Sequence, residues 1–345
     1  MKRLSLSLCT VLLASVSNIF AWDYEGHRLV NEIALTSLPT NFPAFALTPA
    51  AQERVAFLAG EADRWRNSNN QGFQHLNELD HYFDIEGLAP AGLTPQTVSH
   101  FRYEFAGQMY VARAQHPEKF PALDPKKNEA HVHELIGLLP WAIQENYAKL
   151  KSSFSYLKTF EAHGGTPEEI ANAKQNIIYV MGVMGHYCGD AGQPLHTTVH
   201  HHGWVGENPK HYATNSSIHR WIDGGYIGSS GIGLKEMKGR IRPAKTFPGV
   251  EAKDEDIFPG VMDFVMAQNK MVEPLYKLNQ DGSLSDHGEG VSKGRAFVTG
   301  QLIVAGQLLG DLWYSAWDSA QEDSFLKTQL SKRTSPPKPR TTKKR

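Results

Sequence analysis

Two histidine–aspartate pairs constrain this chain more than any other feature. His186 and Asp190 lie in the run MGHYCGDAGQPLH, and His219 and Asp223 lie in SSIHRWID. Residues four apart share one face of a helix, so each pair would present an imidazole beside a carboxylate. One such pair is common as a buried histidine bonded to a carboxylate of the same helix. Two pairs, with His196 ten residues after His186, favour a zinc site instead.

Helical signals cover most of the remaining chain. Thr166, Pro167 and Glu169 form a capping box before apolar residues at three-four spacing, which predicts a helix that ends near Asp190. Thr48 and Pro49 predict a helix that runs through Arg64. Similar patterns cover 27–38, 130–154, 257–278 and 296–320. Few segments alternate in the manner of strands, so we expect an all-α fold in a single compact multi-helix domain.

The two ends differ in composition from the body. Residues 1–21 combine Lys2 and Arg3 with an apolar stretch and a small residue before Trp22. This pattern predicts a signal peptide that is cleaved before Trp22, and hence a secreted or periplasmic protein. Residues 331–345 carry seven Lys or Arg and no acid, which predicts a basic disordered tail after a domain over 22–330.

The charge and cysteine content narrow the class further. Without Lys2, Arg3 and the seven cations of the tail, 26 of the 35 basic residues remain against 36 acidic residues. The body of the chain therefore has a formal net charge of about −10. Such a body does not attract polyanions unless bound divalent metals reverse the local field. Cys9 lies in the predicted signal peptide, so only Cys188 would remain and no intramolecular disulfide is expected. Cys188 should face away from His186 and Asp190 and serve in packing.

Further acids and histidines complete a recognisable order. These residues are Trp22, His27, Asp63, His81, His186, Asp190, His196, His219 and Asp223. The order, with the GDxxQPLH context, resembles the trinuclear zinc phosphodiesterases. That group comprises the single-strand-specific nucleases of fungi, plants and bacteria and the bacterial zinc-dependent phospholipases C. The resemblance spans about residues 22–223.

The resemblance implies three zinc ions. The first would be held by Asp63, His81, His186 and Asp190, and the second by His196, His219 and Asp223. The third would take His27, Asp190 as a bridge, and the α-amino and carbonyl groups of Trp22. That third site requires cleavage directly before Trp22.

The resemblance also implies hydrolysis of a phosphodiester by a metal-activated hydroxide. Asp63 would either orient the hydroxide while binding zinc or act as a ligand only. Arg66 would steady the transition-state phosphate, and the alternative is an ordinary surface arginine. Tyr82 and Asp84 match positions that stack a base and hydrogen-bond its edge, although Tyr82 is equally explained by core packing.

The nuclease branch is favoured because the best-known phospholipases have glutamate where this chain has Asp223. The expected activity is endonucleolytic cleavage of single-stranded DNA and RNA to 5′-phosphate products, with removal of 3′-phosphates from nucleotides. The alternatives are a phospholipase C with a phospholipid substrate, and a non-catalytic exported zinc-binding protein. No obligate protein partner is predicted.

Three departures from the family pattern stand out. Ser217 and Gly224 occupy positions where the nucleases usually have asparagine and a small polar residue. The loop with His200, His201, His202 and His211 is unlike the typical family sequence. It could be a lid, an extra metal site or a solvated loop, and its Gly- and Asn-rich surroundings favour a solvated loop.

Overall fold

The computed structural model describes residues 22–251, 255–285 and 291–334. The predicted signal peptide and tail residues 335–345 therefore lie outside the described residues. Within the described part the elements are almost all helical, and β-type pairing there is confined to an antiparallel bridge between Phe83 and Gly137. The all-α expectation is confirmed. None of the helices described is long and apolar enough to cross a membrane.

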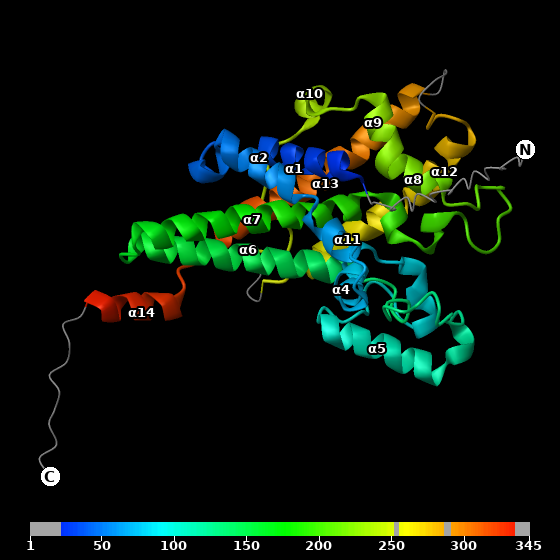
Figure 1. The fold of residues 1–345 in the computed structure, drawn as a ribbon, viewed down its shortest axis with the longest axis horizontal. Helices are drawn as coiled ribbons and strands as arrows, with labels where there is room; N and C mark the ends of the chain where they lie inside the picture. Colours follow the sequence, from blue (N-terminus) through cyan, green and yellow to red (C-terminus); the bar gives the residue numbers. More distant parts are fainter. Residues whose placement is uncertain (1–21, 252–254, 286–290, 335–345) are drawn as a thin grey trace, which may run out of the picture.

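Helix α7 (Pro167–Gly192) is the centre of the bundle (Figure 1). It starts at the predicted capping box, in which Thr166 and Glu169 each accept a hydrogen bond from the backbone of the other. From Met181 to Thr198 every residue is buried. The helices that pack against α7 are α1 (Tyr24–Ser37), α2 (Pro49–Leu58), α6 (Leu139–Ala162) and α13 (Val291–Ser319).

Glycines on α7 allow α1 to approach closely. A Cβ added at Gly185 would lie 1.6 Å from Asn31 Oδ1, and one added at Gly189 would lie 2.6 Å from His27 Nδ1. Side chains at these two positions would therefore force the helices apart. The close packing brings His27 on α1 to the face of α7 that carries Asp190.

Helix α6 begins at Leu139, so the expected start at residue 130 was wrong. Gly137 has a φ of +97°, which ends the possibility of a continuous helix through this point. The preceding segment instead runs beside the residues that follow His81. There Asp84 N–H donates to the Ile136 carbonyl, and Leu139 N–H donates to the Tyr82 carbonyl.

Three other helix boundaries also differ from expectation. The run expected to reach Arg64 is split at Ala59 and Gly60 into α2 and α3 (Glu61–Arg66). The run over 257–278 is split into α11 (Phe258–Asn269) and α12 (Val272–Gln280). Helix α14 (Ser324–Thr334) continues past the expected start of the tail at residue 331, where Arg333 pairs with Glu169 of α7.

Candidate metal centre

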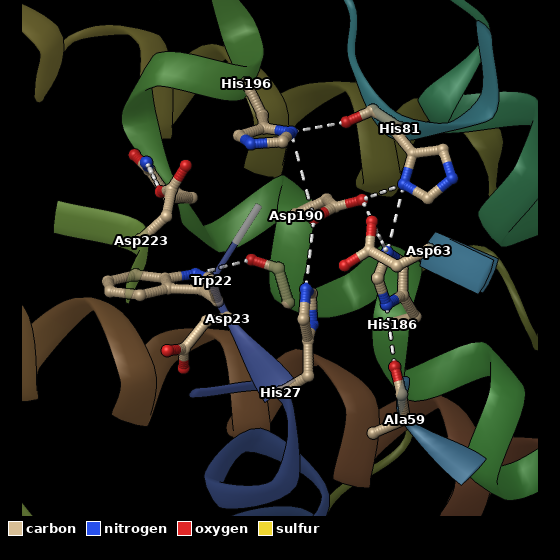
Figure 2. A network of polar contacts seen from close by, with 12 residues as sticks. Trp22, Asp23, His27, Ala59, Asp63, His81, His186, Asp190, His196 and Asp223 are labelled. Carbon is tan, nitrogen blue, oxygen red and sulfur yellow. Dashed lines mark hydrogen bonds and ion pairs between the residues drawn. The ribbon is translucent and has the colours of Figure 1, made fainter. Parts of the chain in front are cut away.

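Buried imidazoles and carboxylates converge at the carboxyl end of α7 (Figure 2). They come from α1, α3, α7 and four short elements: η2 (Glu78–His81), η5 (Pro194–Thr197), α8 (Ser217–Arg220) and the π-helical turn η7 (Trp221–Gly225). Their ligand atoms form three groups, each within 4.8 Å of one another, and these groups could hold metal ions. The groups are Asp63, His81 and His186; His27, His186 and Asp190; and His196, His219 and Asp223.

Asp190 joins the first two groups through its two carboxylate oxygens. Oδ2 lies 3.0 Å from His81 Nδ1 and 3.4 Å from His186 Nε2. Oδ1 lies on the other side, 3.5 Å from His27 Nε2. A carboxylate with one oxygen toward each group has the arrangement expected of a bridging ligand.

In the third group, His219 and Asp223 form the predicted pair four residues apart, and His196 contacts His219. His219 Nε2 lies 2.8 Å from Asp223 Oδ2 and 3.2 Å from His196 Nε2. Gln193 donates from Nε2 to the other oxygen of Asp223, Oδ1, at 2.5 Å. Sequence reasoning missed the role of this fully buried glutamine, although it lies in the GDxxQPLH context.

Backbone carbonyls fix the orientation of two of the candidate ligand histidines. His186 Nδ1 donates to the Ala59 carbonyl at 2.7 Å, and His196 Nδ1 donates to the His81 carbonyl at 2.6 Å. In each ring Nε2 then carries the lone pair that points into the site. Such outer partners select the tautomer of metal-binding histidines. The Ala59 carbonyl that His186 uses lies at the break between α2 and α3.

The side-chain atoms of the three groups are suited to binding cations. Within the described residues, both ring nitrogens of His27, His219 Nδ1, Asp190 Oδ1 and Asp223 Oδ2 are buried without a hydrogen bond. Burial lowers the pKa values of all five histidines in these groups, so the imidazoles are in the neutral form that binds metal. Burial also raises the pKa values of Asp190 and Asp223 well above the usual range. Bound cations would compensate these buried carboxylates.

Trp22 is anchored against the same part of α7. Its indole Nε1 donates to the Gly189 carbonyl at 2.9 Å, and the side chain is buried. The next residue, Asp23, donates its backbone N–H to the Asp223 carbonyl at 2.7 Å. These contacts keep the start of the described chain beside the groups that contain His27 and Asp223 (Figure 2).

Arg66 lies among the carboxylates rather than on the surface. Its side chain is 14% exposed, and Nε donates to Asp63 Oδ1 at 2.8 Å. Its positive charge acts against burial to lower the pKa values of Asp190 and Asp223. The guanidinium therefore contacts Asp63 of the first group directly, and its charge also acts on Asp190 and Asp223.

Tyr82 and Asp84 project from a short extended segment that directly follows His81, the last residue of η2. Phe83 between them is fully buried and donates its N–H to the His196 carbonyl at 2.9 Å. Because side chains alternate along an extended chain, Tyr82 and Asp84 share the opposite face. Both are partly exposed, although Tyr82 also packs against the core.

The histidine loop is not a simple solvated loop. His200 stacks on Trp204 with ring centroids 4.0 Å apart, and Trp204 packs on Tyr212 and Tyr276. This small aromatic core directs His201 toward the site, where Nδ1 lies 3.7 Å from Asp84 Oδ1. Burial lowers the pKa of His201, but the negative charges of Asp84 and Glu86 and the hydrogen bond to the Thr198 carbonyl outweigh it and raise the pKa overall.

Two other residues singled out in the sequence lie apart from the ligand atoms. His211 is exposed and belongs to none of the three groups. Cys188 is a free, fully buried thiol, and burial raises its pKa. It is therefore a packing residue with little thiolate character.

No protein-family model matches the chain, and no curated protein is significantly similar to it. A functional assignment therefore depends on the geometry of the site itself.

Proposed function

We propose that this protein is a zinc-dependent phosphodiesterase that cleaves single-stranded DNA and RNA to 5′-phosphate products. It would also remove 3′-phosphates from nucleotides. The observation that supports this most is the sharing of Asp190 between two ligand groups, with Arg66 beside them. Adjacent metals with a nearby guanidinium are an arrangement suited to phosphoryl transfer.

Each residue of the site has a physical role in this proposal. Zinc ions held by the three groups would activate water at neutral pH and neutralise charge on the phosphoryl oxygens. Asp63 would bind metal, and it accepts the hydrogen bond of Arg66 Nε that would direct the guanidinium at a phosphoryl oxygen. The carbonyls of Ala59 and His81 keep two imidazoles in the tautomer that binds metal.

Tyr82 and Asp84 would bind the part of the substrate next to the phosphate. They project from the segment that follows the candidate ligand His81, so a group attached to a phosphate held at the metal groups would reach them. A tyrosine ring can stack on a base of any sequence. A carboxylate can accept hydrogen bonds from the edge of that base.

Export is part of the same proposal. Cleavage before Trp22 would place the protein in the periplasm or the medium and would free an α-amino group next to His27. The buried indole of Trp22 supports this, because it fixes the residue beside the metal groups.

The decisive experiment is hydrolysis of single-stranded DNA, RNA and phosphatidylcholine by protein with Trp22 at its amino terminus, before and after chelation. Chelator-sensitive cleavage of nucleic acid with 5′-phosphate products is the expected result. Release of phosphocholine alone would instead identify a phospholipase C. Bound zinc without turnover of any of the three would identify a binding protein.

A further inference from the structure

His201 lies at the border between the metal groups and the Tyr82–Asp84 segment. Its ring centroid is 6.4 Å from that of Tyr82 and 6.3 Å from that of the ligand His219. Its Nδ1 lies 3.7 Å from Asp84 Oδ1. We call Tyr82, Asp84 and His201 the recognition group. A phosphodiester bound at His219 would therefore extend over an aromatic ring, a carboxylate and an imidazole.

Several contacts hold His201 in this place. Its Nδ1 donates to the Thr198 carbonyl at 3.0 Å, within the 3₁₀ turn η6 (Val199–His202). Glu86 accepts hydrogen bonds from the Thr198 hydroxyl at 2.7 Å and from the Val199 N–H at 3.1 Å. Tyr276 donates its hydroxyl hydrogen to the His200 carbonyl at 2.5 Å. The turn is thus tied both to the segment after Asp84 and to α12.

The imidazole changes what this group can bind. A tyrosine face with a carboxylate beside it suits a quaternary ammonium, such as a choline headgroup. In this chain the His201 ring lies on one side of the carboxylate, with Nδ1 3.7 Å from Asp84 Oδ1, so it fills space that a trimethylammonium group approaching from that side would need. A neutral planar group meets no such conflict. It can stack on Tyr82 and exchange hydrogen bonds with both polar side chains.

We propose that His201 is a specificity-determining residue, which with Tyr82 and Asp84 selects a nucleobase over a cationic lipid headgroup. This role rests on the proposed phosphodiesterase function. It adds a residue to the site that the family resemblance does not supply.

The test uses the zinc-loaded protein and dithymidine monophosphate, with two analogues that lack the base on one side or the other. The phosphodiester is the same in all three, so any difference between their values of kcat/KM reports base recognition. For the wild type we expect the ratio of kcat/KM for the dinucleotide to kcat/KM for one abasic analogue to be about ten. That is the size of one or two good polar and stacking contacts. In His201→Ala that ratio should fall toward one, and His201→Asn should restore part of it.

His211→Asn is the matched control, because His211 is an exposed histidine of the same loop with a positive φ that asparagine tolerates. It should keep the wild-type ratio. Zinc content, measured by elemental analysis, should be unchanged in every variant. Equal losses on normal and abasic substrates, or no loss in His201→Ala, would overturn the role of His201 while the phosphodiesterase stands.

Glycerophosphocholine separates the remaining outcomes. The wild type should cleave it far more slowly than the dinucleotide, and His201→Ala should narrow that difference. Preference of the wild type for glycerophosphocholine would overturn the inference. If the zinc-loaded wild type cleaves no diester at all, the proposed function itself fails, and the assignment of His201 fails with it.

Discussion

Gln193 donates a 2.5 Å hydrogen bond to Asp223 Oδ1 and leaves the other carboxylate oxygen 2.8 Å from His219 Nε2. The glutamine is itself fixed, since its Oε1 accepts from the Leu195 N–H at 2.8 Å. Gln193, which touches no proposed substrate, thus determines which oxygen of Asp223 faces the histidines of its own group.

Replacing Gln193 by methionine should weaken metal binding at the third group. The substitution keeps the volume but removes the donor, so Asp223 can rotate away from His219. Loss of such an outer partner typically costs about 10- to 100-fold in metal affinity. The measurement is a zinc titration against a competing chelator. Gln307→Met is the matched control, since Gln307 is buried but bonds to Arg242. Equal zinc affinity in Gln193→Met and wild type would contradict this role.

Asp190→Asn should affect two groups at once. The amide cannot supply an anionic oxygen to each of the two zinc ions that His27 and His81 would hold, so we expect loss of two zinc ions and of all measurable hydrolysis. Zinc per chain after dialysis checks this directly. Asp311→Asn removes a similarly buried carboxylate that pairs with Arg242 outside the site, and it should keep full zinc content. An active Asp190→Asn variant with three zincs would disprove the bridge.

Arg66→Ala should lower kcat by about 100- to 1000-fold, the effect of removing one strong donor to a developing oxyanion. Zinc content should change little, because Arg66 contacts the ligand Asp63 without supplying a ligand atom. Arg64→Ala is the control, since Arg64 lies two residues earlier with a side chain that is 52% exposed. A normal kcat in Arg66→Ala would make Arg66 a structural residue.

The helical part of the fold followed from local sequence. The Thr166 capping box and the four-residue spacings depend on neighbours along the chain, and α7 carries His186 and Asp190 as the spacing predicted. The start of α6 did not follow, because Gly137 is held against the Tyr82 carbonyl, where an added Cβ would lie 2.0 Å from the oxygen. That contact joins segments far apart in the sequence.

The same distinction applies to the site. The candidate ligand residues could be listed from their order and its resemblance to a known family, but the position of His201 depends on Trp204, Tyr212 and Tyr276 packing together. Polar residues and glycines around them gave that loop the appearance of a solvated segment. The role of Gln193 was hidden for another reason, since buried glutamines most often serve only to satisfy the backbone.

The metal-free protein should become less stable as the pH falls below about 6.5. Five buried histidines have lowered pKa values, so the unfolded chain binds protons that the folded chain does not. For His219, whose pKa burial lowers to about 3, this costs about 2 kcal/mol at pH 5. The raised pKa values of Asp80, Asp190 and Asp223 act in the opposite sense, so the loss is smaller than the histidines alone would give.

Urea unfolding of the chelator-treated protein at about pH 7 and pH 5 measures this difference in the free energy of unfolding. His219→Asn should make the difference smaller, whereas substitution of the exposed His116 by asparagine should leave it unchanged. Equal stability at the two pH values would show that the histidines are not held neutral.

Residues added before Trp22 should remove one zinc ion and leave the others in place. The α-amino group would become an amide nitrogen, which is a poor metal ligand, and only the carbonyl of Trp22 would remain beside His27 and Asp190. The comparison is between protein processed to Trp22 and the same chain with a short amino-terminal extension, measured as zinc per chain and as kcat. Because the indole of Trp22 is anchored to the Gly189 carbonyl, the extension should not unfold α1. If the extended protein keeps all three zinc ions, the α-amino group is not a ligand, and processing has no part in metal loading.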